Sequence, residues 1–170
     1  DPKKSNSRPI IARLEDMSED KKNIEYKDQV YYALGEVYFR DKNVDKACLQ
    51  WEASSAASTS NNVQKITSCL RAADTYFDLL EKYEKSQMYY DTALAVMPKT
   101  HDKFKKIESR HKVLTNLVTN LRCIERWDSL LAMSVMTEAE LNAKIDSCIS
   151  EYRRVQKEKE EAAKKAQALA

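Results

Sequence analysis

The sequence predicts an all-α protein, and three observations support this fold class. The 170 residues include one glycine and three prolines, whereas sheets joined by tight hairpins need more glycine in their turns. Hydrophobic residues make up 42% of the chain, which is enough for a buried core. Apolar residues recur every three or four positions along most of the chain, the spacing of one helical face. We therefore expect helices joined by short loops.

The first predicted helix and the loop after it occupy residues 1–27. Its apolar residues Ile10, Ile11, Leu14 and Met17 share one face at helical spacing. The segment is similar to the second helix of a helical hairpin whose first helix would precede it. We expect a partial repeat here.

A complete helical hairpin is expected in residues 28–61. Apolar residues follow helical spacing from Tyr31 to Tyr38, stop at the polar segment RDKN, and resume from Val44 to Trp51. The hairpin therefore has a turn of about four residues, a length typical of two antiparallel helices.

The only glycine of the chain, Gly35, lies in the middle of the first helix of this hairpin. Glycine in a helix costs about 1 kcal/mol relative to alanine, so a packing reason is needed. We expect Gly35 and the small Ala47 to let the two backbones approach, with Tyr38 and Trp51 filling the space on either side.

A second copy of this pattern is expected in residues 62–99. The offset from Gly35 to Ala73 is nearly the same as the offset from Trp51 to Tyr90, and a single added position in the second turn accounts for the difference. The pattern predicts an internal repeat with matched packing residues. They are Leu34, Gly35, Tyr38, Ala47 and Trp51 in the first copy, and Ala73, Tyr76, Ser86, Tyr90, Ala93 and Pro98 in the second.

This order of residues resembles the tetratricopeptide repeat. A small residue is followed three positions later by an aromatic residue, and the second helix carries a small residue, an aromatic residue and a closing proline in the second copy. The offset between the copies exceeds the 34 residues of that family, and Thr59 stands where the first copy should have its proline. The resemblance implies an α–α superhelix of stacked hairpins.

Residues 100–155 are expected to form three further helices. A long helix runs from about Asp102 to Arg126, and the segment WDSLLAMSVM after it predicts a short helix. Thr137 and Glu140 form a capping box that begins a last helix. These helices would cap or extend the array of hairpins.

The remaining residues, 156–170, have the sequence QKEKEEAAKKAQALA. Their composition favours a helix, but the apolar face of the preceding helix ends at Val155. We expect a charged helical arm or linker.

The chain lacks the motifs of common enzymes and metal proteins. Phosphate-binding loops need two or more glycines, and the two histidines, His101 and His111, are not part of an HExxH motif. No catalytic residue, metal site, cofactor or small-molecule substrate is therefore assigned.

The four cysteines contain no CxxC pair and fall at or beside apolar helical positions. Such positions are typical of small buried side chains. We expect all four to be buried, and a disulfide stays possible if the fold brings two of them together. They are Cys48, Cys69, Cys123 and Cys148.

A helical-repeat array leaves its first helices to line a concave surface, and this surface is the predicted groove for a partner protein. Aromatic, arginine and acidic side chains together suit peptide capture. The groove residues are Gln29, Tyr32, Glu36, Phe39 and Arg40 in the first copy, and Arg71, Asp74, Phe77 and Asp78, beside Leu70, in the second. The aromatic members would equally pack on adjacent helices, and the sequence leaves both interpretations open. Glu36 and Asp74 argue against a receptor for acidic chain ends.

Nucleic acid is the alternative partner. The net charge is only +2, and lysines alternate with acidic residues nearly everywhere, so no broad basic field is expected. The exception is the segment KFKKIESRHK at residues 103–112. It fits either a solvated helix face or weak phosphate contact.

Four segments of the chain resemble the tetratricopeptide lipoproteins of Bacteroidetes gliding motility and type IX secretion, of the SprE/PorW type. They are LEDMSEDKKNIEYKDQVYYALGEV, DTYFDLLEKYEKSQMYYDTALAVMPKT, LTNLVTNLRCIERWDSLLAMS and TEAELNAKID. The resemblance implies a non-catalytic scaffold module on the periplasmic face of the outer membrane, in a lipid-anchored protein that contacts envelope or secretion components. The alternative is a cytoplasmic tetratricopeptide adaptor that binds a peptide segment of another protein.

Overall fold

The computed structural model of the chain describes residues 7–168. In this range it contains seven α-helices, one 3-10 helix and no strand, so the prediction of an all-α fold is confirmed. The helices are α1 (Arg8–Glu19), η1 (Lys21–Tyr26), α2 (Lys27–Arg40), α3 (Val44–Ala57), α4 (Asn62–Asp78), α5 (Tyr83–Val96), α6 (Phe104–Ser134) and α7 (Glu138–Ala168). Residues 1–6 of the predicted partial repeat lie outside this range.

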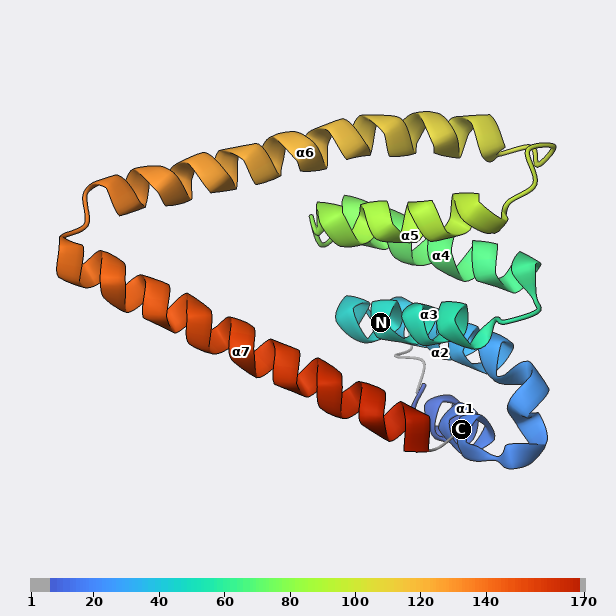
Figure 1. Cartoon of the computed structure of the whole chain (residues 1–170). Helices are drawn as coiled ribbons and strands as arrows, with labels where there is room; N and C mark the ends of the chain where they lie inside the picture. Colours follow the sequence, from blue (N-terminus) through green and yellow to red (C-terminus); the bar gives the residue numbers. More distant parts are fainter. Residues whose placement is uncertain (1–6, 169–170) are drawn as a thin grey trace, which may run out of the picture. The chain divides into compact units, whose positions relative to one another are not determined.

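The chain divides into two compact units, residues 1–120 and residues 121–170. In the first unit, α1 to α5 pack in sequence, each helix against the next (Figure 1). Both buried apolar clusters lie in this unit. The boundary between the units falls inside α6.

The hairpin α2–α3 contains a close contact between Gly35 and Trp51. Trp51 is fully buried, and a Cβ added to Gly35 would lie 2.5 Å from Cδ1 and 3.0 Å from Cε2 of its indole. Only a residue without a side chain leaves room for this ring. The indole lies directly on the glycine rather than to one side of it, and Leu34, Ala47 and Tyr38 surround the contact.

The hairpin α4–α5 has Ala73 and Tyr90 at the matching positions, and both are buried. The Ser86 hydroxyl donates a hydrogen bond to the Ala73 carbonyl at 2.9 Å, which joins the two helices. Ala93 is also buried. Pro98 is exposed and follows Met97 at the C-cap of α5, so it ends the helix rather than packing in the core.

Two tyrosines show that α1 relates to α2 as α3 relates to α4. The Tyr38 hydroxyl donates to Glu15 of α1 at 2.9 Å, and the Tyr76 hydroxyl donates to Glu52 of α3 at 2.5 Å. Burial, with the Glu52 carboxylate next in importance, raises the pKa of Tyr76. The contact between α1 and α2 and the contact between α3 and α4 therefore contain the same kind of bond.

The junction between the two hairpins is polar. Asp28, at the start of α2, is buried, and its carboxylate accepts hydrogen bonds from the Gln29 N–H (2.8 Å), the Ser58 hydroxyl (3.1 Å) and the Asn61 amide (3.1 Å). The Ser54 hydroxyl donates to the Asp28 carbonyl at 2.7 Å. These bonds connect the start of α2 with the end of α3 and the start of α4.

Each hairpin turn contains one residue in the left-handed region of backbone space. Lys42 has φ 62° between α2 and α3, and Glu81 has φ 52° between α4 and α5. The Asn43 side chain then caps α3 by accepting the Lys46 N–H at 3.4 Å. The same turn conformation therefore recurs at matching positions of the two copies.

Helix α6 continues without a break from Phe104 to Ser134. The prediction of a separate short helix at WDSLLAMSVM is therefore wrong. The segment contains no proline or glycine up to Ser134, and nothing else interrupts backbone hydrogen bonding there. In the first unit, α6 buries three residues against α4 and α5, and these are Ile107, Leu114 and Val118.

Helix α7, in the second unit, begins with the predicted capping box. Glu140 Oε2 accepts the Thr137 N–H at 2.8 Å, and Thr137 Oγ1 accepts the Glu140 N–H at 3.4 Å. The helix continues to Ala168, so the predicted arm at residues 156–170 is helical as far as the structure describes it. Its last two residues lie outside the described range.

The cysteines differ between the units. Cys48 and Cys69 are fully buried, and burial raises the pKa of the Cys48 thiol to about 11. Cys123 and Cys148 are exposed, so the prediction that all four are buried is wrong for these two. The apolar faces on which they lie are themselves exposed within the second unit. All four thiols are free.

Candidate functional site

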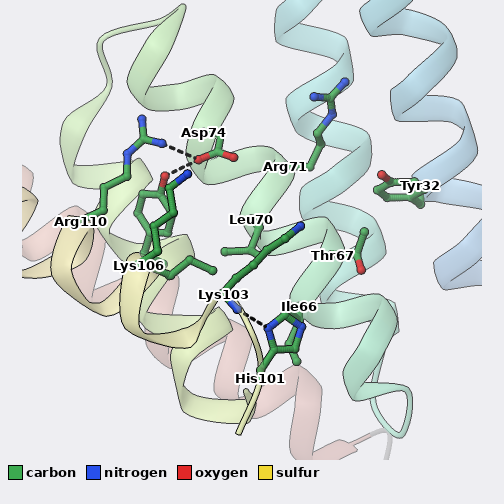
Figure 2. A pocket seen from close by; sticks show the side chains of 12 residues that line it. Tyr32, Ile66, Thr67, Leu70, Arg71, Asp74, His101, Lys103, Lys106 and Arg110 are labelled. Carbon is green, nitrogen blue, oxygen red and sulfur yellow. Dashed lines mark hydrogen bonds and ion pairs between the residues drawn. The ribbon is translucent and has the colours of Figure 1, made fainter. Parts of the chain in front are cut away.

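A pocket of about 380 Å³ lies along one side of α2, α4 and the start of α6, within the first unit. Figure 2 shows its side chains gathered from these elements. They are Tyr32 from α2, then Ile66, Thr67, Leu70, Arg71 and Asp74 from α4, Tyr90 from α5, and His101, Lys103, Lys106, Ile107 and Arg110 from α6 and the loop before it.

The nine residues of the predicted groove fall into three groups. Three of them line the pocket, and these are Tyr32, Arg71 and Asp74. Four contact arginine side chains beside it, and these are Glu36, Phe39, Phe77 and Asp78. Two are exposed and do not line it, and these are Gln29 and Arg40. Arg40 instead donates to the Ser7 hydroxyl at 3.2 Å.

Arg71 links α4 to α2 through charge and ring contacts. Its Nε and Nη2 donate to the two Glu36 carboxylate oxygens at 2.9 and 3.3 Å. Its guanidinium carbon lies 4.5 Å from the centre of the Phe39 ring and 5.1 Å from that of Trp51. A planar guanidinium serves both kinds of contact at once.

Arg110 links α6 to α4 in the same manner. Its two terminal nitrogens donate to Asp74 at 3.1 Å and to Asp78 at 2.8 Å. Its guanidinium carbon lies 4.7 Å from the centre of the Phe77 ring and 5.8 Å from that of Tyr90. We call each of these arrangements, centred on Arg71 and on Arg110, an arginine bridge.

The two arginine bridges are internal repeats of one another. Asp74 matches Glu36 at the offset that relates Ala73 to Gly35, and Arg110 matches Arg71 at the offset that relates Tyr90 to Trp51. In the sequence, Arg110 belongs to the basic segment at residues 103–112, and its role in a bridge was not predicted. The signal that could have found it is this repeated offset, which continues beyond the second hairpin into α6.

The negative charge on the pocket wall has partners, whereas two of the positive charges have no ion pair in the part of the chain that the structure describes. Asp74 is the only carboxylate among the described residues that line it, and it accepts hydrogen bonds from Arg110 and from the Tyr90 hydroxyl. Burial, followed by the bond to Asp74, raises the pKa of Tyr90. Neither Lys103 nor Lys106 has an ion pair to its ammonium group within the described side chains. The pocket therefore offers two uncommitted positive charges and no uncommitted negative one.

Part of the pocket lining is apolar. Ile66 and Ile107 are buried, and Leu70 is half-buried. At the α2 side, burial and the nearby Glu36 carboxylate raise the pKa of the Tyr32 phenol. An aliphatic group would fit against the apolar lining while an anionic group met the lysines.

A second pocket of about 430 Å³ lies beside the first along α6. Lys106 and Arg110 line both pockets. The remaining lining of the second is mostly apolar and consists of Phe77, Ser109, Val113, Leu114 and Leu117. The two pockets thus share two cationic side chains, and we call the two pockets together the groove beside α6.

The basic segment at residues 103–112 is divided by the helix. Lys103, Lys106 and Arg110 line the pocket, whereas Lys105 and Lys112 are exposed and do not. The fold therefore separates the basic residues that line the pocket from those that do not, although all of them lie in one short segment of the sequence.

The two histidines have partners that were not predicted from the sequence. His111 Nε2 of α6 lies 2.6 Å from Asp91 Oδ1 of α5. His101 Nδ1 accepts the Lys103 N–H at 3.2 Å, as Figure 2 shows. Both contacts fix the start of α6 and the loop before it, which carry much of the pocket wall.

No protein-family model matches the chain, and no curated protein matches it either. Within the described residues, no three His, Cys, Asp or Glu side chains are arranged to hold a metal ion. No described helix is both long enough and apolar enough to cross a membrane.

Proposed function

We propose that α1 to α6 form a tetratricopeptide-like module for protein–protein interaction, which binds an extended segment of a partner protein without catalysis. The observation that carries this proposal is the groove beside α6, which is lined both by the uncommitted Lys103 and Lys106 and by apolar side chains. Helical-repeat proteins commonly present such concave surfaces to partners. The repeated arginine bridges support the assignment of α2–α3 and α4–α5 as two copies of one unit.

The chemistry of the groove favours a segment with an acidic residue next to aliphatic ones. Glu36 and Asp74 argued against an anionic partner in the sequence, but each carboxylate is engaged by an arginine in the structure. The remaining charge on the pocket wall is that of the lysines. A carboxylate that meets them would gain attraction and on-rate, while the aliphatic neighbours supply the buried area.

We further propose that this module belongs to an envelope lipoprotein of the gliding motility or type IX secretion kind and contacts other components of that apparatus. The support is the sequence resemblance described above. The cytoplasmic adaptor is the alternative. Fractionation of the source bacterium with an antibody against residues 28–99 decides between them: periplasm-facing membrane fractions favour the first and the soluble cytoplasm the second.

The groove is tested by charge reversal at its two lysines. Lys103→Glu with Lys106→Glu changes the pocket, whereas Lys105→Glu with Lys112→Glu makes the same change of net charge on the same helix outside it. Each variant serves as bait in extracts of the source bacterium, and captured proteins are quantified by mass spectrometry. The affinity for peptides from the captured protein is then measured by fluorescence anisotropy. We expect the first variant to bind about ten-fold more weakly or worse, about 1.4 kcal/mol, and the second to bind like the parent chain.

Two outcomes would contradict the proposal. Equal losses in both variants would indicate non-specific charge attraction, and with nucleic acid as the captured material they would favour phosphate contact. Unchanged capture would place the partner site elsewhere. Substitution of Phe39 or Phe77 is less informative, because their rings contact Arg71 and Arg110 and their loss would disturb the bridges.

A further inference from the structure

The second unit exposes an apolar face on each of its two helices. At the end of α6, Ile124, Trp127, Leu130 and Leu131 are 56%, 61%, 43% and 64% exposed. On α7, Ile145, Ile149 and Tyr152 are 47%, 42% and 66% exposed. Apolar faces this continuous mark contact surfaces in soluble proteins.

The two faces are in register with one another across the turn that joins them. α6 ends at Ser134 and α7 begins at Glu138. At about 1.5 Å per residue, Trp127 lies about 10 Å before the end of α6, and Ile145 lies about 10 Å after the start of α7. An antiparallel pair of these segments would therefore bring apolar residues to the same level.

Cys123 and Cys148 share this register. The same rise places Cys123 about 16 Å from the turn and Cys148 about 15 Å from it. At about 100° per residue, Cys123 is rotated by about −40° from Trp127, and Cys148 by about −60° from Ile145. In an antiparallel pair, residues that are rotated in the same sense from the contact line of their own helices lie on the same side of the pair. Both cysteines would thus face each other at one edge of the contact.

The distances between packed helices suit a covalent bond at this place. Helices pack with axes about 8 to 10 Å apart, and Cα atoms lie about 2.3 Å from each axis. At the rotations of about 40° and 60° given above, the Cα atoms of the two cysteines would lie about 5 to 7 Å apart, which overlaps the range of about 4.4 to 6.8 Å that disulfides require. Cys123 and Cys148 are both exposed and free, whereas Cys48 and Cys69 are buried in the first unit.

We propose that Cys123 and Cys148 form a disulfide that closes the end of α6 and the start of α7 into an antiparallel hairpin. One thiolate attacks a sulfur of an oxidant of the disulfide class, such as oxidised glutathione, and releases one reduced thiol. The second thiolate then attacks the cysteine sulfur of this mixed disulfide and releases the other. Two cysteine thiols are oxidised and one oxidant disulfide is reduced to two thiols. The bond and the apolar faces support the same arrangement.

The test measures the effective concentration of the two thiols in the full chain. The protein is equilibrated in buffers of reduced and oxidised glutathione, free thiols are alkylated, and linked peptides are identified by mass spectrometry. The control is Cys123→Ser with Glu125→Cys, which has a tether of similar length but a thiol about 160° around α6 from Trp127. We expect an intramolecular link between Cys123 and Cys148 with an effective concentration at least about ten-fold above that of the control.

A second variant tests whether packing drives the closure. Trp127→Ala keeps both thiols in place, and we expect it to lower the effective concentration several-fold. Two results would overturn the proposal: an effective concentration that Trp127→Ala leaves unchanged, or a control variant with the same effective concentration as the natural pair. Either would mean that the two thiols meet only by random motion of the chain. Disulfide-linked dimers in place of the intramolecular bond would also overturn it, because a second copy would then cover the apolar faces. The inference concerns the second unit and does not rest on the proposed function.

Discussion

The hairpins α2–α3 and α4–α5 bury different pairs of residues at matching positions. In the first, Trp51 lies on Gly35, and in the second, Tyr90 takes the place of the tryptophan and Ala73 that of the glycine. The larger ring is paired with the smaller partner. The comparison shows that the repeat preserves the combined volume at the crossing of its helices rather than the type of either residue.

The ends of the two hairpins differ more. At the first, the Asp28 carboxylate accepts bonds from Ser58 and Asn61. At the second, Ile66 takes the place of Asp28 and Met97 that of Ser58, and both are buried in the second apolar cluster. The polar end depends on every donor keeping its acceptor, whereas the apolar end depends only on packing.

The largest effect is expected from Asp28→Ala. The change leaves the Asn61 amide and the Gln29 N–H without their acceptor, whereas the Ser58 hydroxyl keeps the Ser54 carbonyl at 2.9 Å. We expect a loss of about 3 kcal/mol in the free energy of unfolding. Ile66→Val at the matching apolar end should cost about 1 kcal/mol. Urea denaturation followed by circular dichroism measures both. Equal losses would mean that the polar network adds nothing beyond packing.

The next largest effect is expected from Gly35→Ala. Helix propensity favours alanine by about 1 kcal/mol, but the new methyl group would overlap the buried Trp51 ring, and we expect a net loss of about 2 kcal/mol. Ala73→Gly should lower stability by at least about 1 kcal/mol, because it loses helix propensity and also a buried methyl group.

The double variant Gly35→Ala with Trp51→Tyr sharpens this prediction, because it reproduces the pair found in α4–α5. We expect it to be at least about 1 kcal/mol more stable than the sum of its two single variants. Strict additivity in the same denaturation experiment would show that the ring and the glycine are not coupled.

The smallest effects are expected at the arginine bridges. Lysine cannot reproduce the paired hydrogen bonds and ring contacts of a guanidinium, so Arg71→Lys and Arg110→Lys should each cost about 1 kcal/mol. Arg71 also contacts Trp51 and should cost the more of the two. The exposed Arg13 provides the control, and Arg13→Lys should leave the melting temperature unchanged. If Arg110→Lys instead cost more stability than Arg71→Lys, the ion pairs with Asp74 and Asp78 would contribute more than the ring contact with Trp51.

The helices of the two hairpins could be predicted from sequence because their packing residues are local and periodic. Gly35, Trp51 and Tyr90 stand at helical spacing from other apolar residues, and the offset between copies is nearly constant. The polar junction at Asp28 gave no such signal, since isolated polar residues near helix ends have no period. The link from Arg110 to Asp74 spans 36 residues, and only the structure shows that the side chains meet.

The continuity of α6 was missed for a different reason. The buried face of its first half ends with Val118, and the next apolar face, which includes Ile124, lies about 120° around the helix. The change of face has the appearance of a chain break in the sequence, although the backbone continues as one helix. The same change explains why Cys123 was expected in a core and is exposed.

The turn residues Lys42 and Glu81 suggest how longer arrays could be engineered from this chain. Both adopt positive φ without being glycine, a conformation that costs other residues about 1 kcal/mol. The only glycine of the chain is used at a helix crossing and not at a turn. A tandem array copied from residues 28–99 therefore has an unused source of stability at every turn, since glycine at these two positions would relieve the backbone without touching a packing contact.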